Sequence, residues 1–373
     1  MSVCRSIRDV AGALSLVVVA SLVPGLAIAA PDEREDTRDV RSRDDRLAAM
    51  STAREVRHRV EDLSARTPSS STFANPDGTW TTESAAAATR APSGSGWAAI
   101  DSTVVKANGG FSPKNAPFDV TFGAGRSTSV ARVKPTGGVS LDLGWANTLA
   151  APQVSGATLT YSAAAGPGDL VVKSSSSGFN YSVVMPKKPT SPVAIAVPIA
   201  VRGAKLRTSA DGSIEVVEGK RVVVRMSAPV MWDSAKRATR VPVATSIARS
   251  AGGAILTLKP SMQWLTDPAR IYPVTVDPTV TINGSGDTWI DSGSNASSQF
   301  AGTDLRIGTQ SLGATVARSY LNFDVSALTT NPGVVVSSAS VNLTGFDAGT
   351  CPASAVRLSQ VTSPWSPSTL TWG

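Results

Sequence analysis

The chain has 373 residues, with 35 Lys and Arg against 28 Asp and Glu, which gives a formal net charge of +7 at neutral pH. That length leaves room for two or three domains with substantial cores. With one histidine and two cysteines, the chain cannot hold a framework of several disulfides or a zinc site of several His and Cys ligands. A Ser-His-Asp triad would have to use His58, which lies in a charged segment.

The first 29 residues have the pattern of a secretory signal peptide. Arg5 and Arg8 precede an apolar run from Val10 to Val23, and Ala27-Ile28-Ala29 matches a cleavage site. The apolar run is too short to span a bilayer comfortably. We therefore predict a secreted, extracellular protein without a membrane span, cleaved after residue 29.

Residues 30–66 form a charged segment that lacks Gly and Pro after Pro31. Apolar residues recur there at helical spacing, namely Leu47, Met50, Val56, Val60 and Leu63. The spacing predicts a helix from about Arg43 to Arg66, with a thin apolar stripe and with His58 on its surface.

Residues 67–96 are rich in Ser, Thr, Gly and Ala, a composition typical of a linker. Within them, Asn75-Pro76-Asp77-Gly78 is a strong turn signal followed by Thr79-Trp80-Thr81. This pattern predicts one hairpin inside the linker.

Residues 97–279 predict a β-rich domain, because short apolar stretches alternate with turn signals such as Asn108-Gly109 and Gly137-Gly138. Large aromatic residues in this domain are expected in its core; they are Trp145, Trp232 and Trp264. The expected strands are Phe118–Phe122, Val139–Leu143, Ala157–Tyr161, Leu170–Lys173, Phe179–Val184, Val193–Val201, Arg221–Met226, Ala254–Leu258 and Ile271–Val276.

The same domain holds 20 Lys and Arg against 10 Asp and Glu, whereas residues 280–373 hold three against five. A basic face could bind anionic cell-wall polymers or nucleic acid. The alternative is a solvated sheet surface with scattered cations. The alternative is favoured because no aromatic residues are interspersed with the basic ones, so no nucleic-acid partner is expected.

Residues 280–373 begin with three short strands that are separated by polar turns: Asp287–Asp291, Leu305–Gly308 and Arg318–Val325. A period of two predicts half-buried strands of an incomplete β-sandwich or jelly roll. The inward residues are expected to be Ile290, Leu305, Ile307, Leu321 and Phe323. The outward residues are expected to be Trp289, Arg306, Arg318 and Tyr320.

Blocks in this stretch carry a resemblance. They are Asp287-Thr-Trp-Ile, Phe300-Ala-Gly, Leu305-Arg-Ile-Gly, Arg318-Ser-Tyr-Leu-Asn-Phe-Asp, Val361-Thr-Ser-Pro-Trp and Thr371-Trp372. In this order they resemble the DNRLRE domain, which is carbohydrate-binding module family 96, over the last quarter of the chain. Trp289 stands where the family more often has a smaller aromatic residue. The family domain would continue past Gly373, so we expect it to be C-terminally truncated here, with downstream domains missing.

The preceding domain resembles the region before DNRLRE domains in secreted actinobacterial wall-associated proteins of the RHS/YD-repeat type. The residues concerned are Trp97-Ala-Ala-Ile-Asp101, Ala116–Val120, Pro229-Val-Met-Trp-Asp233 and Tyr272–Pro278. The resemblance implies a module at the front of a larger protein. The missing strands would then supply a cysteine partner for Cys351, since a lone thiol is unusual in a secreted protein.

The four outward residues form the candidate carbohydrate-binding set: Trp289, Arg306, Arg318 and Tyr320. An aromatic ring can stack on a sugar, and a guanidinium can hold a carboxylate. Asp287 and Asp291 are candidate Ca²⁺ ligands, with turn-capping as the alternative. No other cofactor is expected.

The sequence thus predicts a non-catalytic module that binds a polysaccharide or cell-wall glycan. The alternative is a structural scaffold that presents downstream repeats or a toxin domain and binds no glycan. An enzyme is not expected, because the sequence shows no P-loop, no G-x-S-x-G motif and no pair of carboxylates that it can place together.

Overall fold

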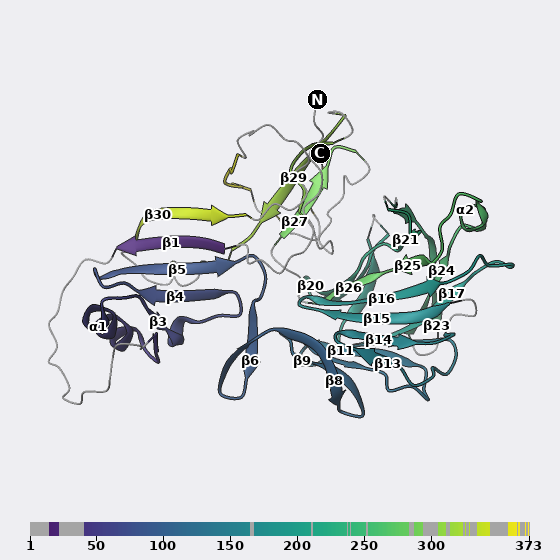
Figure 1. Cartoon of the computed structure of the whole chain (residues 1–373), viewed down its shortest axis with the longest axis horizontal. Coiled ribbons are helices and arrows are strands. Elements are labelled where there is room, and N and C mark those ends of the chain that lie inside the picture. The colour runs from purple at the N-terminus through teal and green to yellow at the C-terminus, as the bar shows by residue number, and fades with distance from the viewer. Residues whose placement is uncertain are drawn as a thin grey trace. The chain divides into compact units, whose positions relative to one another are not determined.

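The computed structural model describes residues 15–21, 41–164, 168–209, 212–236, 238, 240–250, 253–282, 287–293, 305–310, 314–323, 325, 328, 334–343, 357–363, 365, 370 and 372. These residues form mostly strands (Figure 1), so the predicted mainly-β class is confirmed. The chain divides into a central unit, residues 91–284, and a second unit that combines residues 1–90 with 285–373. The sequence had placed these divisions at residues 97 and 279.

Two antiparallel sheets build the central unit. The first, which we name the eight-stranded sheet, has the order β23-β24-β17-β12-β11-β10-β9-β8. Its strands are β8 (Asp101–Ala107), β9 (Gly110–Asn115), β10 (Asp119–Phe122), β11 (Ser129–Thr136), β12 (Val139–Gly144), β17 (Ile195–Arg202), β23 (Ala244–Ser250) and β24 (Gly253–Lys259). Asn108 and Gly109 both have positive φ, 53° and 74°, as the tight turn between β8 and β9 requires.

The second, the eleven-stranded sheet, has the main order β13-β14-β15-β16-β26-β20-β19-β18, with β21, β22 and β25 attached beside it. Its strands are β13 (Gln153–Ser155), β14 (Thr158–Tyr161), β15 (Asp169–Ser175), β16 (Gly178–Met185), β18 (Lys205–Thr208), β19 (Ile214–Glu218), β20 (Arg221–Met226), β21 (Val230–Trp232), β22 (Val241–Pro242), β25 (Val274–Asp277) and β26 (Thr279–Ile282). A short helix, α2 (Met262–Thr266), follows β24. A strand occurs at each of the nine stretches predicted in this region.

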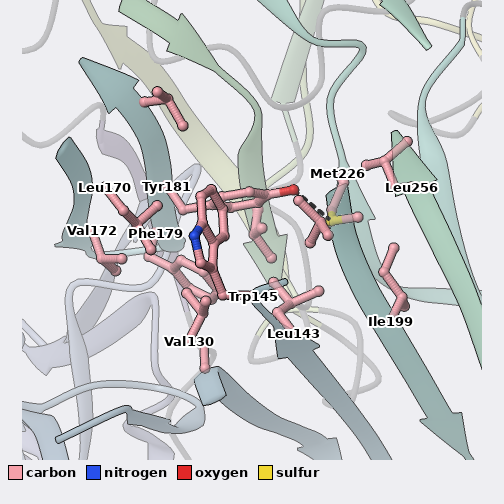
Figure 2. Packing of buried hydrophobic residues seen from close by; sticks show 14 of the residues in the cluster. Val130, Leu143, Trp145, Leu170, Val172, Phe179, Tyr181, Ile199, Met226 and Leu256 are labelled. Carbon is pink, nitrogen blue, oxygen red and sulfur yellow. Dashed lines mark hydrogen bonds between the residues drawn. The ribbon is translucent and has the colours of Figure 1, made fainter. Parts of the chain in front are cut away.

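The core of the central unit lies between these two sheets (Figure 2). Phe122 of the first sheet and Phe179 of the second meet edge to face, with ring centroids 5.3 Å apart. Tyr181 is buried beside them, and its hydroxyl contacts the sulfur of Met226 at 3.9 Å. Such aromatic burial is a large stabilising contribution.

The three tryptophans predicted for this core differ in how deeply they are buried. Trp145 is buried, and its indole N–H donates to the carbonyl oxygen of Ala164 at 2.7 Å. Trp232 and Trp264 are only half-buried. Each of these two rings lies under an arginine instead: Arg240 at 5.0 Å and Arg270 at 4.7 Å.

Strand β26 occupies the interior of the eleven-stranded sheet, where it pairs with β16 on one side and with β20 on the other. Two of its side chains, Val280 and Ile282, are almost completely buried in the core. Gly178 of β16 approaches β26 so closely that a Cβ there would lie 1.9 Å from the carbonyl oxygen of Val280. The strand is therefore integral to the central unit.

Ion pairs take up part of the central unit's positive charge. Exposed cations pair across neighbouring strands, and Arg225 and Arg207 both donate to the buried carboxylate of Glu215. The cross-strand pairs are Lys114–Asp101 at 3.7 Å, Arg132–Asp142 at 2.5 Å and Lys134–Asp119 at 3.8 Å. This pairing supports the interpretation of a solvated sheet surface over that of a basic binding face.

The second unit contains the N-terminal sheet, with the order β2-β3-β4-β5-β1-β30. Its strands are β1 (Ser15–Ser21), β2 (Ser42–Arg43), β3 (Val60–Asp62), β4 (Ser70–Ala74), β5 (Thr79–Ala85) and β30 (Val335–Asn342). Strand β1 falls inside the predicted signal peptide. No helix among the described residues has the length and apolar character needed to cross a membrane. A further hairpin joins β6 (Arg90–Ser93) and β7 (Gly96–Ala99); all of its residues except Arg90 belong to the central unit.

The predicted N-terminal helix is present but much shorter than expected. Helix α1 (Arg46–Val56) begins with Asp45 as its N-cap, whose Oδ1 accepts from the backbone N–H of Ala48 at 2.8 Å. It ends where Arg57 adopts a left-handed conformation, with φ of 57°. His58 therefore follows the helix, and Val60 belongs to β3. A 3₁₀ turn, η2 (Leu63–Ala65), comes next.

Residues 67–96 do not form a linker. The predicted hairpin at Asn75-Pro76-Asp77-Gly78 is confirmed, and it joins β4 to β5. Trp80 of β5 packs with Ala49 and Ala53 of α1 in a small core, under the guanidinium of Arg46 at 4.4 Å. The Ser- and Thr-rich composition was misleading because Thr, a β-branched residue, also fits strands.

The interior position of β26 predicts a strong effect of Ile282→Ala. Removing most of a side chain that is 2% exposed should cost about 2–5 kcal/mol of unfolding free energy. Hydrogen exchange measured by mass spectrometry in the full chain should become faster in peptides from β16 and β20. Ile271→Ala is the matched control, because Ile271 is 53% exposed. Unchanged exchange in β16 and β20 would contradict the role of β26.

Candidate functional site

The candidate site lies on the C-terminal sheet, whose strands run in the order β27-β29-β28. The strands are β27 (Asp287–Asp291), β28 (Gly308–Gln310) and β29 (Thr315–Leu321), and all pairing is antiparallel. Directly opposite residues in such a ladder point to the same face. The register between β27 and β29 therefore decides which candidate residues can form one surface.

That register separates Trp289 from the other candidates on β29. Trp289 lies opposite Ser319, whereas Arg318 lies opposite Ile290. Trp289 and Arg318 consequently face opposite sides of the sheet. The prediction of a single outward face that includes Trp289 was wrong. It assumed that Trp289 on the first strand and Arg318 on the third strand point to the same side of the sheet.

Trp289 is a buried residue, 3% exposed, and Arg306 covers it. The guanidinium carbon of Arg306 lies 4.3 Å from the centroid of the Trp289 ring. The hydroxyl of Ser319 donates to the carbonyl oxygen of Arg306 at 2.8 Å, which fixes this segment beside β29. A cation–π contact contributes about 0.5–2 kcal/mol, depending on how far it is removed from water. Arg306 and Trp289 thus act together as a structural pair on their face.

The indole N–H of Trp289 has no hydrogen-bond partner among the described residues. Leaving such a donor buried is costly, so its neighbours must compensate through packing.

The other face gathers a different set of residues. Arg318 is exposed, and its guanidinium carbon lies 4.6 Å from the centroid of the Trp372 ring. Tyr320, two residues further along β29, contacts Trp365 with ring centroids 5.6 Å apart and an interplanar angle of 52°. All three aromatic residues are half-buried. We name these four residues the arginine–aromatic cluster.

Two members of this cluster were not candidates in the sequence analysis. Trp365 and Trp372 occur in blocks that carried the family resemblance, but tryptophans in such blocks are commonly core residues. No periodicity connects them with β29, because the contact depends on tertiary packing. The blocks themselves were the one signal that could have identified them.

Asp287 and Asp291 cannot together bind one Ca²⁺ ion. They are the two ends of β27, four residues apart. At 3.2–3.4 Å per residue their Cα atoms are roughly 13 Å apart, whereas Ca²⁺ ligands lie at about 2.3–2.6 Å from the ion. Asp291 instead accepts a hydrogen bond from the backbone N–H of Gly293 at 2.8 Å, as in the turn-capping alternative.

No group of three potential metal ligands from His, Cys, Asp and Glu occurs in the part of the chain that the structure describes. Cys351 lies outside the described residues, so its expected pairing stays a prediction.

Comparison with known proteins finds a family to which this part of the chain is similar. The profile of carbohydrate-binding module family 96 matches residues 278–373. The C-terminal region is therefore similar to a carbohydrate-binding module. We refer to it below as the family 96 region. The match begins at Pro278, so it includes β26, which is built into the central unit.

Three curated relatives share a short segment with this chain. The tRNA nuclease WapA of Bacillus subtilis strain 168 and the tRNA3(Ser)-specific nuclease WapA of Bacillus spizizenii are each 33% identical to it over 89 residues. The aligned segment covers 21% of this chain and 4% of each relative, so the chain spans only a small fraction of their length. No solved structure matches the chain.

The structural role of Trp289 leads to a second prediction. Trp289→Ala should destabilise the C-terminal sheet by about 3–5 kcal/mol, because it empties a buried aromatic site. Hydrogen exchange in peptides from β27 and β29 would report the loss. Leu358→Ala serves as the control, since Leu358 is 59% exposed and an exposed substitution should change stability by about 0.5 kcal/mol or less. Equal effects of the two variants would show that Trp289 is not a core residue.

Proposed function

We propose that the family 96 region binds a polysaccharide through the arginine–aromatic cluster, as a non-catalytic module. The observation that carries this proposal is the cluster itself. It places the exposed Arg318 and three half-buried aromatic rings on one face of a region that matches a carbohydrate-binding family. The proposal moves the site from the four predicted residues to Arg318, Tyr320, Trp365 and Trp372.

The chemistry of the cluster suits carbohydrate. Aromatic rings offer apolar faces against which the C–H bonds of a pyranose can stack, while the sugar hydroxyls at the rim of the pyranose stay in contact with water or polar groups. The guanidinium of Arg318 can hold a carboxylate through two parallel hydrogen bonds. Arg318 already lies against Trp372, which limits the entropy lost when a ligand binds. An acidic or neutral polysaccharide is therefore the proposed ligand class.

A binding role is favoured over catalysis and over a purely structural scaffold. The matched family is one of carbohydrate-binding modules. The nuclease relatives share only a segment that is 4% of their length, so a nuclease activity for this chain would need evidence from other residues. We propose that this chain contributes attachment to a glycan, in the wall-associated context that the sequence resemblance implies.

Substitutions in the cluster test this function. Arg318→Ala and Tyr320→Ala should each weaken binding to a polysaccharide in affinity electrophoresis or on a glycan array. Loss of a charged contact costs roughly 1.5–3 kcal/mol, or about tenfold to a hundredfold in affinity for Arg318→Ala. Arg357→Ala is the matched control, because Arg357 is an exposed arginine of the same region.

Both cluster variants should keep the melting temperature of the unmodified protein within about 2–4 °C. If binding is lost only in proportion to unfolding, the cluster is structural and the scaffold alternative is correct. If no polysaccharide binds the unmodified protein, the proposed function fails outright.

We also propose that the protein is secreted with cleavage between Ala29 and Ala30. The support is the charged, apolar and small-residue pattern of the first 29 residues. Cleavage would remove β1, which lies between β5 and β30 in the N-terminal sheet. The intact mass of the exported protein should therefore begin at Ala30. The proposal would be contradicted if the exported protein kept its first 29 residues, or if the protein were absent from the medium.

A further inference from the structure

Strand β23 (Ala244–Ser250) is an edge of the eight-stranded sheet. All seven of its residues are exposed. It pairs with β24 along its whole length without a bulge. Its other side therefore presents an uninterrupted row of backbone donors and acceptors to solvent, and such a row is a template for a further strand.

The other edges of the central unit are short, charged or covered. At the opposite end of the same sheet, β8 donates from the backbone N–H of Val104 to the carbonyl oxygen of Gly156 at 2.9 Å, which occupies part of its edge. In the eleven-stranded sheet, the terminal strand β13 has three residues, and β18 has four, including Lys205 and Arg207. Natural proteins protect edges by these means. Within the described part of the central unit, β23 is a seven-residue edge strand that is exposed along its whole length, and Arg249 is its one charged residue.

We propose that β23 pairs antiparallel with β23 of a second copy of this chain, around a twofold axis at Ile247. In that register Ile247 lies opposite its own copy, and Thr245 lies opposite Arg249. No like charges meet, because Arg249 is the strand's one charged residue. Ile247, 36% exposed, gains an apolar partner. The strand is thus complementary to itself in sequence as well as in backbone.

A twofold pair of this kind closes on itself. It joins two eight-stranded sheets edge to edge and uses up both β23 strands. Isologous contacts of this type give dimers, whereas other edge contacts can propagate into filaments. Seven residue pairs bury less surface than a standard stable interface. The dimer should therefore be reversible and dependent on protein concentration.

Charge substitutions at one position test the register. Sedimentation velocity of the full chain should show a monomer–dimer equilibrium. Thr245→Glu places a carboxylate opposite Arg249 twice per dimer and should tighten the dimer roughly two- to thirtyfold. Thr245→Lys places like charges together and should weaken it by a similar factor. Val154→Lys is the control, because Val154 is 40% exposed on the edge strand β13 and should leave the equilibrium unchanged.

Cross-linking tests the twofold axis directly. In a background with Cys4 and Cys351 replaced by Ser, Ile247→Cys should form an intermolecular disulfide on mild oxidation. Val154→Cys in the same background should not. A protein that stays monomeric at all accessible concentrations would overturn the proposal. So would a dimer that responds equally to Thr245→Glu and Thr245→Lys, because that dimer would use another surface.

Discussion

Packing between the inner faces of two sheets holds the central unit together, and strand register decides which side chains reach that space. Each inward position on β16 is apolar or aromatic, as at Phe179, Tyr181 and Met185. A shift of one residue would turn these side chains to the outer face and bury polar ones such as Asn180. The close approach of Gly178 to the carbonyl oxygen of Val280 fits the register that is observed between β16 and β26. Hydrophobic alternation therefore determines which side chains form the core of the central unit and which remain on its surface.

Alternation also explains how much of the fold could be predicted from the sequence. Strands with a clear period of two and an apolar inner face, such as β12 and β16, could be placed closely. The N-terminal helix was extended too far because Val60 and Leu63 continue the helical spacing, although Arg57 breaks the backbone before them. Residues 67–96 appeared to be a linker because their buried residues are mostly Ser and Thr. A Ser- and Thr-rich composition does not show whether a segment is exposed, because hydroxyl side chains can be buried in a sheet when they hydrogen-bond to one another. Thr72 and Thr82 do so.

The candidate site was harder to predict because it depends on pairing between strands. Period two places Arg318 and Tyr320 on one face of their own strand, and the structure agrees. It gives no information about how that face relates to the faces of β27, so Trp289 was placed on the wrong side. Trp365 and Trp372 join the cluster through tertiary contacts that leave no periodic signal. Resemblance to the family identified the region, and only the three-dimensional contacts identified the surface.

The position of β26 has a mechanical consequence. Tension on the chain beyond β26 would enter the central unit at Ile282, the last residue of an interior strand that is hydrogen-bonded on both sides. Pulling on such a strand loads many backbone hydrogen bonds at once, whereas pulling on an edge strand can open them one by one. Force applied at Ile282 would therefore meet more resistance than the same force applied to an edge strand.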